Sequence, residues 1–229
     1  MDKKNVRIAL DLDNTIRDFN SQLIKVYLKY YPYHRSLITP LKDWDDYEVH
    51  HYFPIKRDIY DFMYENPKEI FVDAPMIPGA YDAIKTLKKC GFYFLVVSSQ
   101  KPEVQEHSLQ WIDNMKIKPM EIYFDEDKHN LVDSFDYLID DSPTQLKNVF
   151  DASGKVIIFD QPYNRDLPLD VEGGSFRAKN WHDVVCHFLE DRLNEPLIRQ
   201  IYRHHTLGKS EIPKRSLEFV DKDHINVGV

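Results

Sequence analysis

A short apolar run, Val6 to Leu10, ends directly in a pair of carboxylic acids, Asp11 and Asp13. The run is too short for a helix and is interrupted only by Arg7, so it predicts a buried strand. Asp11 then stands at the carboxyl end of the strand, where open parallel sheets bind their ligands. Two acids at this spacing suit a divalent metal, or a nucleophile with an acid/base partner. The alternative is that Asp11 ends the strand and Asp13-Asn14 forms a turn.

The bulk composition narrows the class of protein. A chain of 229 residues can form one domain with a sizeable insertion. Thirty basic and 38 acidic residues give a net charge of -8, which argues against a general nucleic-acid-coating surface but leaves room for a local basic groove. The two cysteines, Cys90 and Cys186, are too few and too far apart for a disulfide framework. Without a signal-like segment or a run of membrane-spanning length, we expect a cytoplasmic protein with no membrane partner.

The segment after Thr15 predicts a helical insertion rather than more sheet. Apolar residues at three-and-four spacing indicate a helix from Phe19 to about Tyr31. Prolines then divide an aromatic-rich stretch into short pieces. We therefore expect residues 18–75 to form a small helical cap over the first two acids. Its aromatic side chains either pack as core or stack on a base or sugar, and the candidate substrate contacts are Phe19, Trp44 and Tyr47.

From Met76 onward, strands and helices alternate. Apolar strands are expected at residues 93–97, 121–124, 137–141 and 156–159, with helices between them and a last helix after Asn180. This alternation predicts an α/β fold with a mainly parallel sheet, built from residues 1–17 and 76–195. The stretch from Asp160 to Arg177 is expected to be a loop. Residues 196–229 form a basic extension without an assigned role.

Polar groups follow two of these later strands. Ser98 and Ser99 end the strand that begins at Tyr93, and Asp140-Asp141 ends another. Two adjacent acids are costly to ionise unless a positive charge lies beside them, and a bound Mg²⁺ would supply it. Asp141-Ser142 could equally form a helix N-cap before Pro143. A hydroxyl and a lysine could bind an anion at this edge, and Lys128 competes with Lys101 for that role.

Together these strand ends carry the groups needed for phosphoryl transfer. The sequence resembles the haloacid dehalogenase (HAD) superfamily of phosphatases, whose four motifs are matched by Asp11-Leu12-Asp13-Asn14-Thr15, Ser98, Lys128 and Asp140-Asp141. Within this superfamily the chain is most similar to the 5′(3′)-deoxyribonucleotidase family, over about residues 5 to 195. The similarity rests on five segments in the same order: FVDAPMIPGAYDAIKTL, FLVVSSQK, YLIDDSP, FDQPYNR and NWHDVV. The chain departs from the animal enzymes of that family at Asn14-Thr15, where they have Gly-Val, and at Ser142, where they have arginine.

The resemblance implies a Rossmann-like three-layer core with a cap inserted after the first strand. It implies Asp11 as nucleophile and Asp13 as general acid/base, with Ser98, Ser99 and Lys128 binding phosphate. Mg²⁺ would be bound by Asp11, by the backbone carbonyl of Asp13, and by one of Asp140 or Asp141.

The function that we expect is Mg²⁺-dependent hydrolysis of (deoxy)nucleoside monophosphates through an aspartyl-phosphate. Two alternatives have different substrates: nucleic-acid 3′-ends bound by the basic extension, which is less favoured, or another small phosphorylated metabolite. A third is a protein that binds or sequesters a nucleotide without hydrolysing it. The oligomeric state is open, and a dimer is one option.

Overall fold

The protein was analysed as a computed structural model that describes residues 6–168, 174–190 and Gln200. Its centre is one parallel sheet in the order β3-β2-β1-β4-β5-β6, and every pairing is parallel. The strands are β1 (Arg7–Leu10), β2 (Tyr93–Ser98), β3 (Ile122–Phe124), β4 (Tyr137–Asp140), β5 (Val156–Phe159) and β6 (Phe176–Ala178). The strand order reverses between β1 and β4, which makes their carboxyl ends the expected ligand site. The α/β fold class predicted from the sequence is confirmed.

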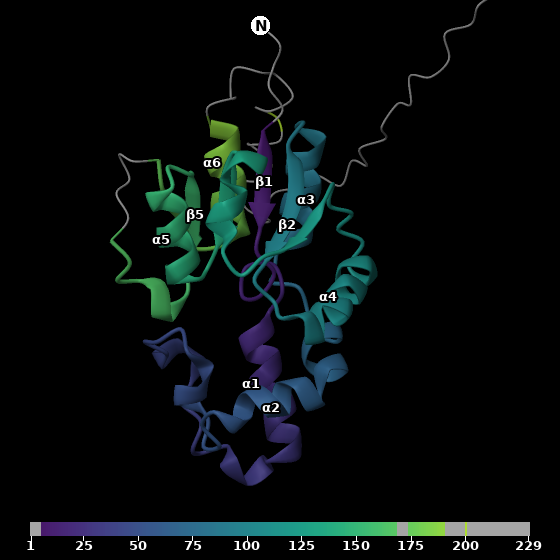
Figure 1. The fold of residues 1–229 in the computed structure, drawn as a ribbon, viewed down its shortest axis with the longest axis vertical. Helices are drawn as coiled ribbons and strands as arrows, with labels where there is room; N and C mark the ends of the chain where they lie inside the picture. The colour runs from purple at the N-terminus through teal and green to yellow at the C-terminus, as the bar shows by residue number, and fades with distance from the viewer. Residues whose placement is uncertain (1–5, 169–173, 191–199, 201–229) are drawn as a thin grey trace, which may run out of the picture.

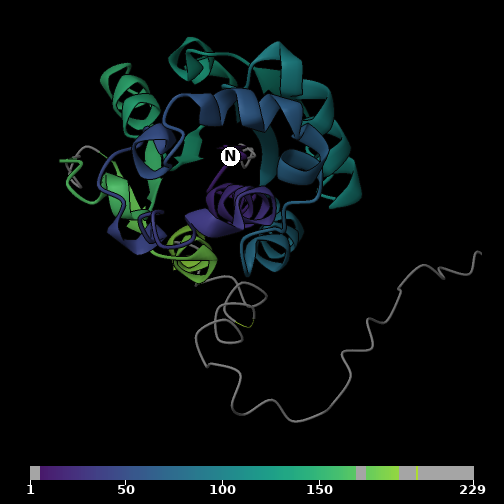
Figure 2. The same cartoon turned by 90° about the horizontal axis from the view of Figure 1, so that it is seen from below.

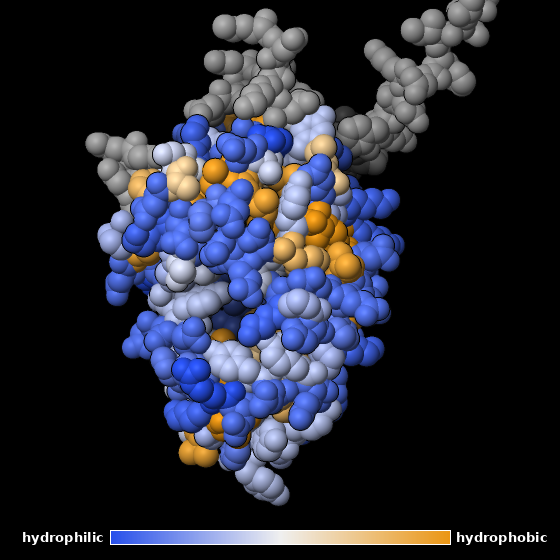
Figure 3. Space-filling model, viewed as in Figure 1, coloured by the Kyte–Doolittle hydropathy of each residue, from blue (hydrophilic) through white to orange (hydrophobic). Residues whose placement is uncertain are grey.

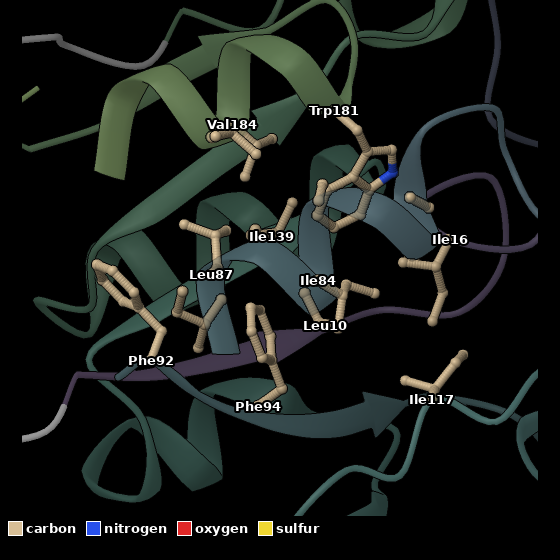
Figure 4. Close-up of a cluster of buried hydrophobic side chains, with 14 of the residues drawn as sticks. Leu10, Ile16, Ile84, Leu87, Phe92, Phe94, Ile117, Ile139, Trp181 and Val184 are labelled. Atoms are coloured by element: carbon tan, nitrogen blue, oxygen red, sulfur yellow. The ribbon is translucent and has the colours of Figure 1, made fainter. Parts of the chain in front are cut away.

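Helices cover both faces of the sheet and make the core three layers thick. They are α3 (Ala80–Lys89), α4 (Pro102–Asn114), α5 (Pro143–Asp151) and α6 (Trp181–Glu190). Side chains alternate along a strand, so Leu10 packs with α3 and α6 on one face, while Ala9 packs with α5 on the other. Figure 4 shows the first of these clusters, in which Trp181 and Val184 of α6 project toward Leu10 and Ile139.

The segment between β1 and α3 forms a helical unit with its own apolar core. It contains α1 (Phe19–Tyr30), α2 (Asp58–Glu65), the short 3-10 helices η1 (Pro32–His34), η2 (Leu41–Asp43) and η3 (Val49–Tyr52), and the π-helix η4 (Lys68–Val72). Its buried cluster includes Leu23, Tyr27, Phe53 and Phe62 and is separate from the two clusters of the sheet. We call this unit the cap. It lies beyond the end of the sheet toward which β1 points (Figure 1), and its helices extend across that end (Figure 2).

One local prediction was wrong. The expected loop from Asp160 to Arg177 contains the 3-10 helix η6 (Pro162–Asn164) and runs into the edge strand β6, which pairs with β5. Three residues are too few for a periodic signal, and the neighbouring strand supplies the hydrogen bonds that define the element. Asn180 caps α6 as expected, because its Oδ1 accepts a hydrogen bond from the backbone N–H of Asp183 at 3.0 Å.

Among the described residues, no helix is long and apolar enough to cross a membrane. The basic extension, residues 196–229, lies outside the described residues apart from Gln200.

Candidate active site

The two strands at the point of reversal bring acids from distant parts of the chain together. Leu10 is paired with Ile139, so Asp11 and Asp140 are the next residues on adjacent strands. The backbone N–H of Asp11 donates to the carbonyl of Ile139 at 3.0 Å, which extends the ladder to the acid itself. Asp11, Asp140 and Asp141 expose 7%, 0% and 1% of their surfaces. The three carboxylates therefore lie close together with almost no exposure to solvent.

Lys128 lies between two of these acids. It begins the 3-10 helix η5 (Lys128–Ser134), and its Nζ lies 2.5 Å from Asp11 Oδ1 and 2.6 Å from Asp140 Oδ2. Burial alone would lower the pKa of this ammonium, but the charges of Asp11 and Asp140 outweigh burial and raise the pKa above its usual value. Lys128 therefore remains charged and neutralises one of the three carboxylates.

The remaining negative charge fits a divalent cation. Asp11, Asp140 and Asp141 each offer an oxygen within 4.8 Å of the others, and such hard oxygen ligands suit Mg²⁺. Burial, opposed by the charge of Lys128 and reinforced by those of Asp140 and Asp13, raises the pKa of Asp11 from 3.8 to about 7. Burial and the charges of Asp11 and Asp140 also raise the pKa of Asp141 well above its usual range. A cation bound here would remove the cost of ionising these groups.

The hydrogen bonds of the two adjacent aspartates differ. Both oxygens of Asp140 are occupied, Oδ2 by Lys128 and Oδ1 by the backbone N–H of Ser142 at 2.8 Å. Asp141 accepts a long bond of 3.3 Å from Thr15 Oγ1 at Oδ1 and a bond from the Tyr163 hydroxyl at Oδ2. Of the four carboxylate oxygens of Asp140 and Asp141, Asp141 Oδ1 therefore has the longest hydrogen bond and is the most available to another ligand.

The carboxylate of Asp13 is held by partners outside the cluster of three buried acids. Arg17 Nε donates to Asp13 Oδ1 at 2.7 Å, and Gln100 Nε2 donates to Asp13 Oδ2 at 2.7 Å. Asn14 follows Asp13 with a φ of 57°, a left-handed conformation that Asn tolerates better than most residues. The Asn14 side chain also accepts a hydrogen bond from the backbone N–H of Asn20 at 2.9 Å. The turn and the acidic site predicted from the sequence thus coexist.

The other residues singled out for phosphate binding lie at the same edge of the sheet. Ser98 ends β2 and is 2% exposed, and Ser99 follows it half-buried. Lys101 is exposed at the start of α4, whereas Lys128 is buried against the acids. Of the two lysines considered, Lys128 is the one that contacts Asp11.

The three candidate substrate contacts in the cap have different environments. Phe19 and Trp44 are 6% and 1% exposed and belong to the core of the cap, where Trp44 stacks on Tyr52 with ring centroids 4.4 Å apart. Tyr47 is 43% exposed and meets Tyr163 edge to face at 5.6 Å. Burial of its hydroxyl end, and then the charges of Asp141 and Asp11, raise the pKa of Tyr47 well above its usual value.

Tyr47 is thus the aromatic of the three that reaches from the cap to the acids. On the face shown in Figure 3, the surface is hollowed between the core and the cap.

Several residues at the site were not predicted from the sequence. Arg17, Gln100 and Ser108 surround Asp13, while Tyr163 and Asn164 contact Asp141, Asn164 by donating to its carbonyl oxygen at 2.9 Å. Arg17 had no local signal, because it stands between Ile16 and Asp18 in a stretch of mixed polar and apolar residues. Tyr163 and Asn164 had none beyond the motif in which they stand.

Solved structures share this fold. A HAD-family hydrolase from Deinococcus radiodurans R1, crystallised with phosphate and sodium, matches 84% of this chain and 98% of its own with a TM-score of 0.58 and 14% identity. The HAD hydrolase YfnB from Bacillus subtilis, crystallised with magnesium, matches 82% of this chain and 100% of its own with a TM-score of 0.54 and 14% identity. At these identities the likeness concerns the fold. The fold of this chain is therefore that of the HAD hydrolases.

Sequence comparison then specifies the family. The family model described as 5′ nucleotidase, deoxy (pyrimidine), cytosolic type C protein matches residues 4–193. A curated protein of Oceanobacillus iheyensis, whose name assigns it provisionally to the nucleotidases, is 24% identical over 198 residues, which are 82% of this chain and all of the relative. The chain belongs to the cytosolic type C deoxy (pyrimidine) 5′-nucleotidase family.

Proposed function

We propose that this protein is a Mg²⁺-dependent phosphatase of deoxynucleoside monophosphates, with pyrimidine 5′-monophosphates as the first substrates to test. The observation that carries the proposal is the cluster of Asp11, Asp140 and Asp141 around Lys128 at the point of strand reversal. The substrate class is supported by the match of residues 4–193 to the deoxy (pyrimidine) 5′-nucleotidase family.

In this proposal Asp11 is the nucleophile. Lys128 binds its Oδ1, while no described residue donates a hydrogen bond to Oδ2. The free oxygen attacks phosphorus, the ester P–O bond breaks, and the electron pair of that bond goes to the leaving oxygen. Asp13 gives this oxygen its proton and the nucleoside departs. Water then attacks the aspartyl-phosphate, Asp13 takes a proton from the water, and inorganic phosphate leaves with Asp11 regenerated.

The acidic residues of the site would also bind the metal. Asp11 and Asp141 would bind Mg²⁺ through side-chain oxygens and Asp13 through its backbone carbonyl. Asp141 is preferred to Asp140 because the only hydrogen bond to Asp141 Oδ1 from the described residues is a long one of 3.3 Å, whereas Lys128 and the backbone N–H of Ser142 hold the two oxygens of Asp140 more closely. When bound, Mg²⁺ would neutralise charge on the phosphoryl oxygens and orient them for in-line attack. Asp140 orients Lys128, and Ser98, Ser99 and Lys128 would receive the phosphoryl oxygens.

The cap would supply contacts to the nucleoside. Tyr47 is the strongest candidate, because it is partly exposed and reaches the acids from the cap. Phe19 lies in the cap core beside Phe71, with ring centroids 5.4 Å apart, and would serve mainly to shape the wall of the site.

The test is a phosphate-release panel of deoxy- and ribonucleoside 5′- and 3′-monophosphates, each with Mg²⁺ and with a chelator. We expect Mg²⁺-dependent release from deoxypyrimidine 5′-monophosphates and its abolition in Asp11→Asn. Equal activity with chelator would overturn the metal requirement, and an active Asp11→Asn variant would overturn the nucleophile. Tight nucleotide binding without phosphate release would instead favour a sequestering protein.

A further inference from the structure

The carboxylate of Asp13 belongs to a closed ring of hydrogen bonds. Arg17 Nε donates to Asp13 Oδ1 at 2.7 Å, and Arg17 Nη1 donates to Ser108 Oγ at 3.1 Å. Ser108 donates to Gln100 Oε1, and Gln100 Nε2 returns to Asp13 Oδ2 at 2.7 Å. Each hydrogen in the ring has one donor and one acceptor, so the direction of the Gln100 amide is set by its neighbours.

Arg17 is the most constrained member of this ring. Its side chain is fully buried, and its Nη1 also donates to the carbonyl of Phe71 at 3.1 Å. The guanidinium carbon lies 5.3 Å from the ring centroid of Phe71 and 5.4 Å from that of Trp111, within range of cation–π attraction. A planar group fixed by hydrogen bonds and by two aromatic rings has little freedom to turn.

The backbone around Arg17 is equally well fixed. Arg17 forms bridges with Asp13 and with Met76, the residues before and after the cap. On either side of it, the N–H of Asp18 donates to the carbonyl of Pro75 and the N–H of Ile77 donates to that of Ile16, both at 2.9 Å. The two chain crossings between core and cap therefore run side by side at Arg17.

The two oxygens of Asp13 consequently have unlike partners. Oδ1 is bound by a buried, charged and immobile group, whereas Oδ2 is bound by a neutral amide of the half-buried Gln100. A substrate oxygen can replace the Gln100 contact more readily than the Arg17 contact, because charged hydrogen bonds are the stronger ones.

We propose that Arg17 is a positioning residue that orients Asp13 so that Oδ2 faces the leaving oxygen of the substrate. This inference rests on the proposed role of Asp13 as the acid of the reaction. The alternative is that Arg17 only stabilises the join between core and cap. The two roles predict different effects on activity. Loss of an orienting residue slows most the hydrolysis of substrates whose leaving group needs a proton, whereas loss of a purely structural residue slows all substrates alike.

The experiment compares two substrates, thymidine 5′-monophosphate and p-nitrophenyl phosphate. The deoxyribose alkoxide needs protonation as it departs, whereas p-nitrophenolate is a stable anion that needs little. The ratio of kcat/KM for the nucleotide to kcat/KM for p-nitrophenyl phosphate thus reports on the acid. It is measured for wild type, Asp13→Asn, Arg17→Met, Arg17→Lys and the control Arg7→Met, which removes an arginine paired with Asp136 at the other end of β1.

We expect the ratio to fall about a hundredfold in Asp13→Asn, since general acid catalysis is worth at least about that factor. Arg17→Met should lower it by more than about tenfold, Arg17→Lys should recover part of that loss, and Arg7→Met should leave it unchanged. If Arg17→Met fails to fold, Arg17→Lys alone tests the proposal. Its ratio of kcat/KM for the nucleotide to kcat/KM for p-nitrophenyl phosphate must then still lie below that of wild type.

Equal loss on both substrates in the Arg17 variants would overturn the inference and leave Arg17 a purely structural residue. That result differs from a failure of the proposed function. An unchanged ratio in Asp13→Asn would reject the acid role itself, and full activity in Asp11→Asn would reject the nucleophile.

Discussion

Arg17 and Asp13 form an ion pair in which one partner is fully buried and the other is not. The distance from Nε to Oδ1 is 2.7 Å, and the side chains expose 0% and 24% of their surfaces. The pair lies beside the acid cluster rather than within it. Its contribution to stability can therefore be measured apart from metal binding.

The coupling energy of this pair should exceed that of a surface pair. Removing one partner of a buried ion pair leaves a charge unpaired, which costs about 3–5 kcal/mol in other proteins. Because Asp13 is partly exposed, we expect a coupling free energy of about 2 kcal/mol from a double-mutant cycle of Asp13→Asn and Arg17→Met. Urea unfolding in chelator measures it. The exposed pair Lys147 and Asp151 on α5 serves as control, for which we expect no more than about 0.5 kcal/mol. Equal couplings would contradict the prediction.

The metal-free protein should lose stability as pH rises. The pKa of Asp11 in the folded protein is raised from 3.8 to about 7, so the folded state keeps a proton that the unfolded state releases. The unfolded state binds fewer protons between about pH 4 and pH 7, and stability therefore falls with pH across that window. Asp141, whose pKa is also raised, adds to the slope.

Thermal unfolding in chelator and in Mg²⁺ at pH 5 and pH 8 tests this pH dependence. We expect Mg²⁺ to raise Tm more at pH 8, because metal binding competes with protons for the same carboxylates. Asp11→Asn should flatten part of the pH slope in chelator. A Mg²⁺ effect that is equal at both pH values would count against the cluster as the metal site.

Lys128 should be essential to both stability and activity. Its Nζ is the one described side-chain cation within 4.0 Å of Asp11 and Asp140, so Lys128→Met leaves three buried carboxylates without a positive partner. We expect a loss of about 3 kcal/mol in chelator, part of it restored by Mg²⁺, and a loss of activity of at least about a hundredfold. Lys101→Met, at an exposed position, should change either quantity little. A larger effect at Lys101 would reverse the assignment of the phosphate-binding lysine.

Tyr47 should affect substrate binding more than the chemical step. It meets Tyr163 edge to face at 5.6 Å and remains 43% exposed, so it can contact a nucleoside without supporting the cap core. We expect Tyr47→Ala to raise KM for thymidine 5′-monophosphate several-fold with a smaller change in kcat. Trp44→Phe is the comparison, since Trp44 is buried and should change Tm rather than KM. A kcat effect without a KM effect would argue against contact with the nucleoside.

Much of the acidic site could be predicted because of a property of parallel sheets. Strands that run the same way end at the same edge, so Asp11, Ser98 and Asp140 could be expected near one another before their strand order was known. The order then decided which are neighbours: β1 lies between β2 and β4, and Asp11 is adjacent to Asp140 across the point of reversal. The strand β6 was missed because its three residues become a strand only by pairing with β5.

The sequence by itself determined the parallel α/β core, the helical insertion after the first strand and the acids that follow two of the strands. Only the tertiary structure decided that Lys128, 117 residues from Asp11, lies between two of these acids, and that Arg17 and Gln100 donate hydrogen bonds to Asp13. Periodicity reports which face of an element is buried, over a few turns or one strand. A hydrogen bond needs two atoms within about 3 Å, and that distance depends on how segments far apart in the chain pack together.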